Sequence, residues 1–143
     1  MAVSFHIIPP LPYKLENRIK LKRWIKSIVD SYDKSIGDIS IVLCTDEYLY
    51  QINVDYLKHS FYTDIITFDN SDDPNCMEGD IFISVNRVAE NALKYGVTTE
   101  EELRRVMAHG ILHLLGYKDK KPEEQELMRQ KENECLQLFN TLS

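Results

Sequence analysis

The stretch HGILHLLGYKD, residues 109–119, places two histidines one helical turn apart in an otherwise apolar run. Apolar residues recur around them at helical spacing, which predicts a central, buried helix from Thr99 to about Gly116. Because His109 and His113 are four residues apart, their side chains share one strip of that helix, with Cβ atoms about 5–6 Å apart. Each imidazole taken out of water needs a polar partner.

Two interpretations of this histidine pair are open. A lone histidine on an apolar face is usually a core residue that is hydrogen-bonded to the backbone. Two histidines one helical turn apart favour a divalent cation, because one ion can bind a nitrogen of each ring. Gly116 can end the helix and turn the chain, which would bring Asp119 back as a third ligand. We therefore predict a site for one divalent metal, with zinc as the expected ion, at His109, His113 and Asp119.

The spacing of these three residues matches the register of the metzincin zinc signature, whose last position is usually histidine. Three protein ligands leave a fourth position open, as in catalytic zinc sites. Such a zinc lowers the pKa of a water molecule to about 7, so hydrolysis is the expected chemistry. The HExxH proteases carry a general-base glutamate after the first histidine. Gly110 stands there instead, which argues against peptide hydrolysis, and we expect it to leave space above the metal for a substrate.

Hydrophobic periodicity predicts strands in the first 85 residues and mainly helices in the rest. The predicted fold class is α+β. We expect one domain over residues 1–143, in which helices cover a mixed sheet of about four strands mainly on one face. The last two strands should pair antiparallel, and Thr98 with Glu101 or Thr99 with Glu102 has the spacing of a capping box. The expected strands are 3–8, 38–44, 63–68 and 79–85, and the expected helices are 15–32, 45–57, 86–95, 99–116 and 122–139.

Composition limits the class of protein. The net charge of −6 argues against a surface that binds phosphates indiscriminately. Three scattered cysteines form no disulfide framework or metal clamp, so we expect reduced thiols. No apolar run reaches the roughly 20 residues of a membrane-spanning helix, and the N-terminal stretch lacks a signal-peptide pattern. A cytoplasmic protein is therefore expected.

Three segments together resemble one family. HGILHLLGYKD is similar to the HGxLHLxGYDH motif of the YbeY family, bacterial metal-dependent endoribonucleases that mature ribosomal RNA. NVDYLKHSFYTDIITFDN and GDIFIS resemble two further segments of that family, and the resemblance covers most of the chain. It implies a zincin-like fold, a metal held by His109, His113 and residue 119, and cleavage of single-stranded RNA. The implied role is maturation of the 16S rRNA 3′ end and ribosome quality control, with the small ribosomal subunit as partner.

The chain departs from the family motifs at two places. Lys118-Asp119 replaces Asp-His after Gly-Tyr, so a carboxylate stands in for the third imidazole and makes a harder, more negative site. The family's arginine falls at Leu57, which has no charge to offer a phosphate. Lys58 and His59 follow it in the sequence, and we predict that they stabilise the negative charge that develops on the phosphate in the transition state. The other interpretation is that both are solvated loop residues.

Two other functions are compatible with the sequence. One is a metzincin-like metallopeptidase, which Gly110 disfavours. The other is a ribosome-assembly factor in which the metal is structural and RNA is held without being cut. It would need a basic patch, and Arg18, Lys22 and Lys26 lie close together on the first predicted helix, although such charges more often mark a solvated face. For the nuclease, attack by water and attack by the RNA 2′-hydroxyl are both open.

Overall fold

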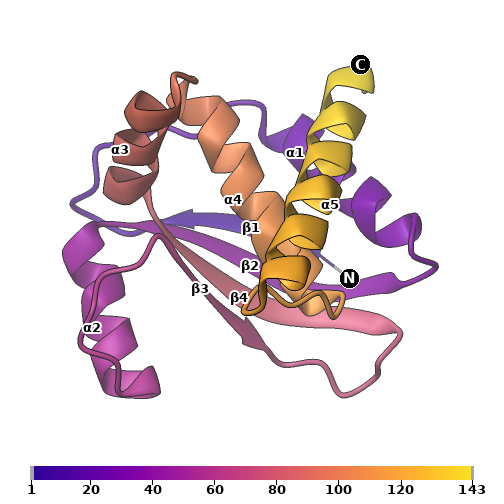
Figure 1. The fold of residues 1–143 in the computed structure, drawn as a ribbon, viewed down its shortest axis with the longest axis horizontal. Coiled ribbons are helices and arrows are strands. Elements are labelled where there is room, and N and C mark those ends of the chain that lie inside the picture. The colour runs from indigo at the N-terminus through magenta and orange to yellow at the C-terminus, as the bar shows by residue number, and fades with distance from the viewer. Residues whose placement is uncertain (1, 143) are drawn as a thin grey trace.

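The structure is a computed structural model that describes residues 2–142. Within this range the chain forms four strands and five helices, which confirms the predicted α+β class (Figure 1). The strands are β1 (Ala2–Ile7), β2 (Ser35–Cys44), β3 (Ile65–Asp69) and β4 (Cys76–Ser84). The helices are α1 (Arg18–Asp30), α2 (Asp46–Leu57), α3 (Val85–Tyr95), α4 (Thr99–Leu114) and α5 (Pro122–Thr141).

The four strands form one mixed sheet in the order β1-β2-β4-β3. β1, β2 and β4 run parallel, while β3 pairs antiparallel with β4, for example Thr67 opposite Ile81. The predicted antiparallel pairing of the last two strands is therefore confirmed. β3 lies at the edge of the sheet, so one side of its backbone is not paired with another strand.

Helices cover the two faces of the sheet unequally. α1, α3, α4 and α5 lie on one side of the sheet, and α4 runs between α3 and α5 (Figure 1). Their main core includes fully buried Trp24, Met107 and Ile111. α2 covers part of the opposite face through a smaller cluster that contains Leu49 and Ile66. The prediction of a sheet covered mainly on one face is confirmed.

Helix ends show where sequence patterns succeed and fail. The capping box at Thr98 and Glu101 is present, and the Thr98 hydroxyl accepts the Glu101 N–H at 3.1 Å. The alternative box, which would begin at Thr99, is wrong because Thr99 is the first residue of α4. The first helix was also placed too early: Asn17 is left-handed with φ 60°, so α1 begins at Arg18 and Leu15 is buried in the preceding loop.

The state of the cysteines and the length of the helices bear on two expectations drawn from the composition. Cys44, Cys76 and Cys135 are free thiols, as predicted. Burial raises the pKa of the Cys44 and Cys135 thiols to about 12, so neither is a reactive thiolate at neutral pH. Among residues 2–142, no helix has both the length and the apolar character needed to cross a membrane.

Gly110 corrects one prediction from the sequence. A Cβ atom at this position would lie 3.0 Å from two carbons of Ile81 and 3.1 Å from Ile65 Cδ1. The glycine therefore faces the sheet and lets α4 pack closely on β3 and β4. It does not open space for a substrate above the two histidines, as the sequence had suggested.

Replacing Gly110 by valine should push α4 away from the sheet. We expect Gly110→Val to lower the free energy of unfolding by about 2 kcal/mol, because overpacking a tight core typically costs 1–3 kcal/mol. Gln137→Val, on the exposed side of α5, should change it by no more than about 0.5 kcal/mol. Chemical denaturation measures both, and equal stability of the Gly110→Val variant and the wild type would contradict this packing.

Candidate metal centre

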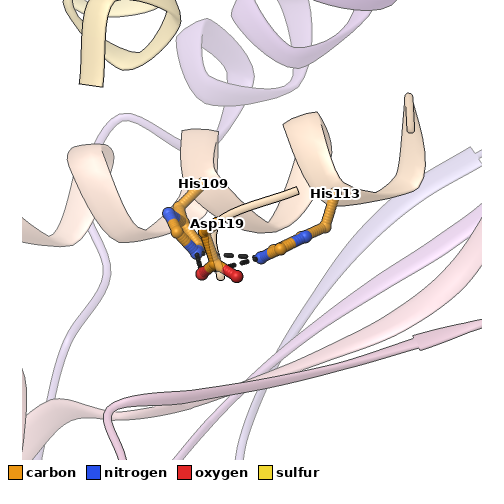
Figure 2. Close-up of side chains that lie close together, drawn as sticks. All are labelled: His109, His113 and Asp119. Carbon is orange, nitrogen blue, oxygen red and sulfur yellow. Dashed lines mark hydrogen bonds and ion pairs between the residues drawn. The ribbon is translucent and has the colours of Figure 1, made fainter. Parts of the chain in front are cut away.

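Three polar side chains from two segments converge at one point (Figure 2). His109 Nε2 lies 3.0 Å from His113 Nε2, and Asp119 Oδ2 lies 3.1 Å and 3.3 Å from these two nitrogens. All three side chains are partly buried. The structure thus brings together the three residues that the sequence singled out, in a group that could hold a metal ion.

The end of α4 explains how Asp119 reaches the two histidines. Leu115 caps the helix, and Gly116 then takes a left-handed conformation with φ 105°, which reverses the chain. The turn is closed by a hydrogen bond from the Tyr117 N–H to the Leu112 carbonyl at 3.0 Å. The Tyr117 hydroxyl donates to the Tyr32 hydroxyl at 3.3 Å, which ties the turn to the end of α1. Asp119 follows this anchored turn directly.

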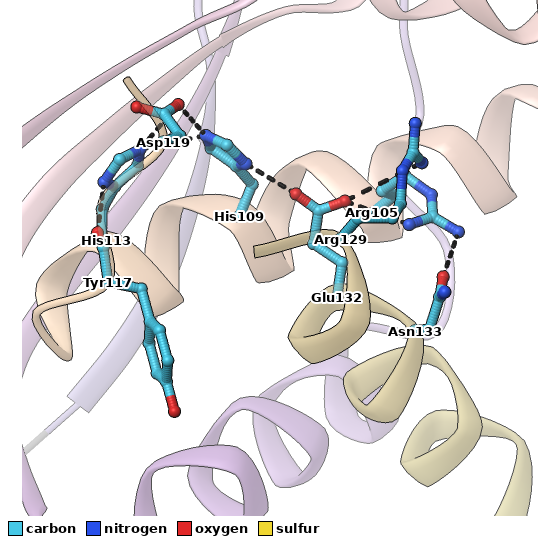
Figure 3. A network of polar contacts seen from close by, with 8 residues as sticks. All are labelled: Arg105, His109, His113, Tyr117, Asp119, Arg129, Glu132 and Asn133. Carbon is cyan, nitrogen blue, oxygen red and sulfur yellow. Dashed lines mark hydrogen bonds and ion pairs between the residues drawn. The ribbon is translucent and has the colours of Figure 1, made fainter. Parts of the chain in front are cut away.

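The outer nitrogen of each imidazole is already hydrogen-bonded (Figure 3). His109 Nδ1 lies 2.7 Å from Glu132 Oε2, and His113 Nδ1 lies 2.9 Å from the Tyr117 carbonyl oxygen. A carboxylate and a carbonyl only accept hydrogen bonds, so both Nδ1 atoms carry the hydrogen. In the neutral form of each ring, Nε2 therefore directs a lone pair toward Asp119. Such outer partners are what fixes the orientation of metal-binding histidines.

The donor set fits a divalent cation. Two nitrogen lone pairs and a carboxylate oxygen lie 3.0–3.3 Å apart, and they repel one another unless a positive charge lies between them. A proton on one nitrogen or a metal ion supplies that charge. Two imidazoles and one carboxylate form a ligand set known from catalytic zinc sites, and it leaves a fourth position free.

Glu132 and Arg105 extend this centre, and the sequence did not predict either of them. Glu132 Oε1 accepts from Arg105 Nη1 at 3.0 Å, and Arg105 Nη2 donates to Asn133 Oδ1 at 2.9 Å (Figure 3). The Glu132 side chain is only 9% exposed. It stands on the inner side of α5 with Met128 and Cys135. A glutamate on an apolar helix face was the signal that could have revealed it.

Electrostatics tie His109 and Glu132 together. Burial lowers the pKa of His109, but the hydrogen bond to Glu132 and the charges of Glu132, Asp119 and Asp64 outweigh burial and raise it overall. Burial raises the pKa of Glu132, but the hydrogen bonds from His109 and Arg105 outweigh it and lower the pKa overall. Glu132 is therefore an ionised acceptor at neutral pH. Without a metal, His109 retains its proton to a higher pH than a free histidine.

The three residues lie in a cleft of about 700 Å³. Its walls include the edge strand β3, the segment that follows α2, and the facing sides of α4 and α5. His59 and Leu57 line this cleft. Lys58 is not among the lining residues, and its Nζ donates to the Asp55 carbonyl at 3.3 Å. The structure thus brings His59, but not Lys58, into the same cleft as the three converging side chains.

Other charged side chains of the cleft were not predicted from the sequence. Lys120 and Arg129 contribute positive charge to its wall, and the Arg129 side chain is 57% exposed. Asp64 also lines it, and burial raises the pKa of this carboxyl above its usual value. The cleft therefore joins a negative centre to cations at its rim, although the chain as a whole is acidic.

The fold and the site together define an α+β protein in which two histidines of the central helix and an aspartate that follows its C-terminal turn form a group suited to a metal ion, inside a cleft. The family model described as Endoribonuclease YbeY matches residues 13–140. The chain belongs to this family of endoribonucleases, which are hydrolases, so the resemblance found in the sequence is confirmed.

Curated relatives match over most of their length. An Endoribonuclease YbeY of Christiangramia forsetii is 53% identical over 119 residues, which are 83% of this chain and 82% of the relative. One of Cytophaga hutchinsonii is 49% identical over 88% of each chain. The solution structure of TM1509 from Thermotoga maritima shares the fold, with a TM-score of 0.67 and 22% identity over 96% of this chain and 89% of that one.

Glu132 should strengthen metal binding because it fixes the His109 ring. We expect Glu132→Gln to weaken zinc binding about 10- to 100-fold, the usual effect of removing such an outer partner. Glu134→Gln is the matched control, since Glu134 lies on the same helix and is exposed. Competition with a chromophoric chelator gives both affinities. Equal affinities for the two variants would contradict the assignment.

The His109 pKa gives a pH test. In the metal-free protein this ring should titrate above the ordinary 6.5, and Glu132→Gln should lower its pKa by removing a negative charge. A raised folded-state pKa stabilises the metal-free protein below about pH 6.5, and this contribution is lost as the pH rises through the raised value. NMR titration of the ring proton measures the pKa. A wild-type value at or below 6.5 would be the contrary result.

Proposed function

We propose that this protein is a metal-dependent endoribonuclease that cuts single-stranded RNA, with one zinc ion held by His109 Nε2, His113 Nε2 and Asp119. The observation that carries the proposal is the convergence of these three atoms, with both Nδ1 atoms already hydrogen-bonded elsewhere. Membership of an endoribonuclease family supports RNA as the substrate. Asp119 makes the site harder than three histidines would, which widens the range of ions that it can bind.

A divalent ion bound there would supply Lewis-acid chemistry to a phosphodiester. The protein's own residues prepare the site for it. Glu132 and the Tyr117 carbonyl hold the two rings so that their Nε2 lone pairs face inward. Arg105 keeps Glu132 ionised and in place, so α5 supports a ligand that belongs to α4.

Negative charge that develops on the phosphate needs nearby cations or hydrogen-bond donors. Leu57 lies in the cleft wall, where the family resemblance would put an arginine. His59 lines the same cleft, and we propose that it donates to the phosphate, with Lys58 contributing a more distant charge. Lys120 and Arg129 are further cations at the wall that can hold the flanking phosphates.

The biological setting follows from the family. We propose that the chain is one domain over residues 1–143, acts in the cytoplasm, and matures the 3′ end of 16S rRNA with the small ribosomal subunit as partner, where it also takes part in ribosome quality control. The acidic overall charge supports local contacts in the cleft over a general affinity for nucleic acid. Cations in the cleft are consistent with such local contacts.

The two alternative functions fit the structure less well. A peptidase of the HExxH type needs a glutamate at Gly110, and that position packs against Ile81. A binding protein without catalysis would use the basic side of α1. There, Lys26 pairs with Asp30 at 2.8 Å, and Arg18 Nη1 donates to the Phe5 carbonyl at 3.5 Å, which are the contacts of an ordinary helix surface.

His113→Ala should abolish both metal binding and RNA cleavage, because it removes one of three ligands. His6→Ala is the matched control, since His6 is exposed on β1 and contacts Ser4. Metal content by mass spectrometry and cleavage of an unstructured RNA measure the two effects. Product ends identify the nucleophile: a 2′,3′-cyclic phosphate means attack by the 2′-hydroxyl. Retained zinc and full cleavage in His113→Ala would refute the proposed centre.

A further inference from the structure

We propose that the stacked rings of His59 and Phe61 form a platform on which a nucleobase of single-stranded RNA stacks. The ring centroids lie 5.1 Å apart, with an angle of 20° between the planes. Both residues line the cleft that holds His109, His113 and Asp119, and Phe61 is 54% exposed. The inference rests on the proposed function, because it assigns a binding role for RNA to one wall of the same cleft.

The segment that carries the platform is fixed by a buried side chain. Asn53, only 1% exposed, donates from Nδ2 to the Phe61 carbonyl at 2.8 Å. The backbone carbonyl of Asn53 accepts a hydrogen bond from the His59 N–H at 3.1 Å. The backbone at both residues of the platform is therefore held by hydrogen bonds, which reduces the backbone freedom that is lost when a base stacks on the rings.

Further exposed apolar groups line the same cleft. Leu57 is 39% exposed and Tyr95 is 56% exposed, and both line the cleft. A single exposed phenylalanine is unremarkable in a protein surface. Exposed aromatic rings that line the cleft of a metal-binding group have a more specific meaning, because bases of unstacked RNA bind by stacking on aromatic side chains.

Carboxylates outnumber cations among the residues that line the cleft, so phosphates would bind at the local positions where the cations lie. Lys120 and Arg129 supply the cations that contact phosphates, while Phe61 supplies an uncharged face for a base. Single-strand-binding grooves combine these two features. Base stacking adds affinity that does not depend on salt, whereas phosphate contacts lose affinity as salt rises. The two contributions can therefore be measured separately.

The test is equilibrium binding of the full-length, zinc-loaded protein to a fluorescent 2′-O-methyl octauridylate at several salt concentrations. Phe61→Leu keeps the apolar bulk and removes the aromatic face, and we expect it to weaken binding about tenfold without changing the salt slope. Phe61→Trp should bind at least as well as the wild type. Tyr56→Leu is the matched control, because Tyr56 is 72% exposed but does not line the cleft.

An abasic strand of the same length removes the stacking partner, so the difference between wild type and Phe61→Leu should vanish with it. Thermal unfolding confirms that each variant is folded. Affinity of Phe61→Leu within about twofold of the wild type would overturn the platform. So would a loss of equal size on the abasic strand, which would indicate a general apolar contact such as a protein partner makes.

Cleavage of unmodified RNA by the wild type separates this inference from the proposed function. If the wild type cleaves RNA and Phe61→Leu binds like the wild type, only the platform fails. If the wild type binds through Phe61 and cleaves no RNA, the nuclease proposal fails and the platform stands. A wild type that binds no strand overturns the platform whatever the cleavage result.

Discussion

Helix α4 has to bury its apolar sides on the sheet and also keep two imidazoles at a cleft. Gly110 makes the packing on the sheet possible, because the absence of a Cβ atom lets the helix lie close to Ile81 and Ile65. The four-residue spacing of His109 and His113 meets the second requirement, because it puts both rings on one strip. The rest of the site is arranged around the position of this one helix.

Polar partners for the two rings come from different parts of the chain. The turn after α4 supplies the Tyr117 carbonyl to His113, and α5 supplies Glu132 to His109. Glu132 is in turn held by Arg105 of α4, so the two helices are joined by a partly buried ion pair as well as by apolar packing. Removing one member of such a network leaves the others buried without their partners, which is costly.

Local sequence patterns identified the features that depend on neighbouring residues. The histidine spacing, the Gly116 turn and the Thr98 capping box are all local, and each is present in the structure. The class of fold also followed from the order of periodic segments. Features formed between distant segments were missed: Glu132 meets His109 across 23 positions, and Gly110 contacts strands that the helical pattern alone does not place.

The central claim is that one divalent ion binds between His109 Nε2, His113 Nε2 and Asp119. Anomalous X-ray diffraction at the zinc edge, from crystals of the zinc-loaded protein, tests it most directly. The account predicts a single strong peak about 2.0–2.2 Å from both Nε2 atoms and from an Asp119 oxygen. The absence of a peak there, or a zinc bound elsewhere while the two Nε2 atoms remain in contact with each other, would contradict it.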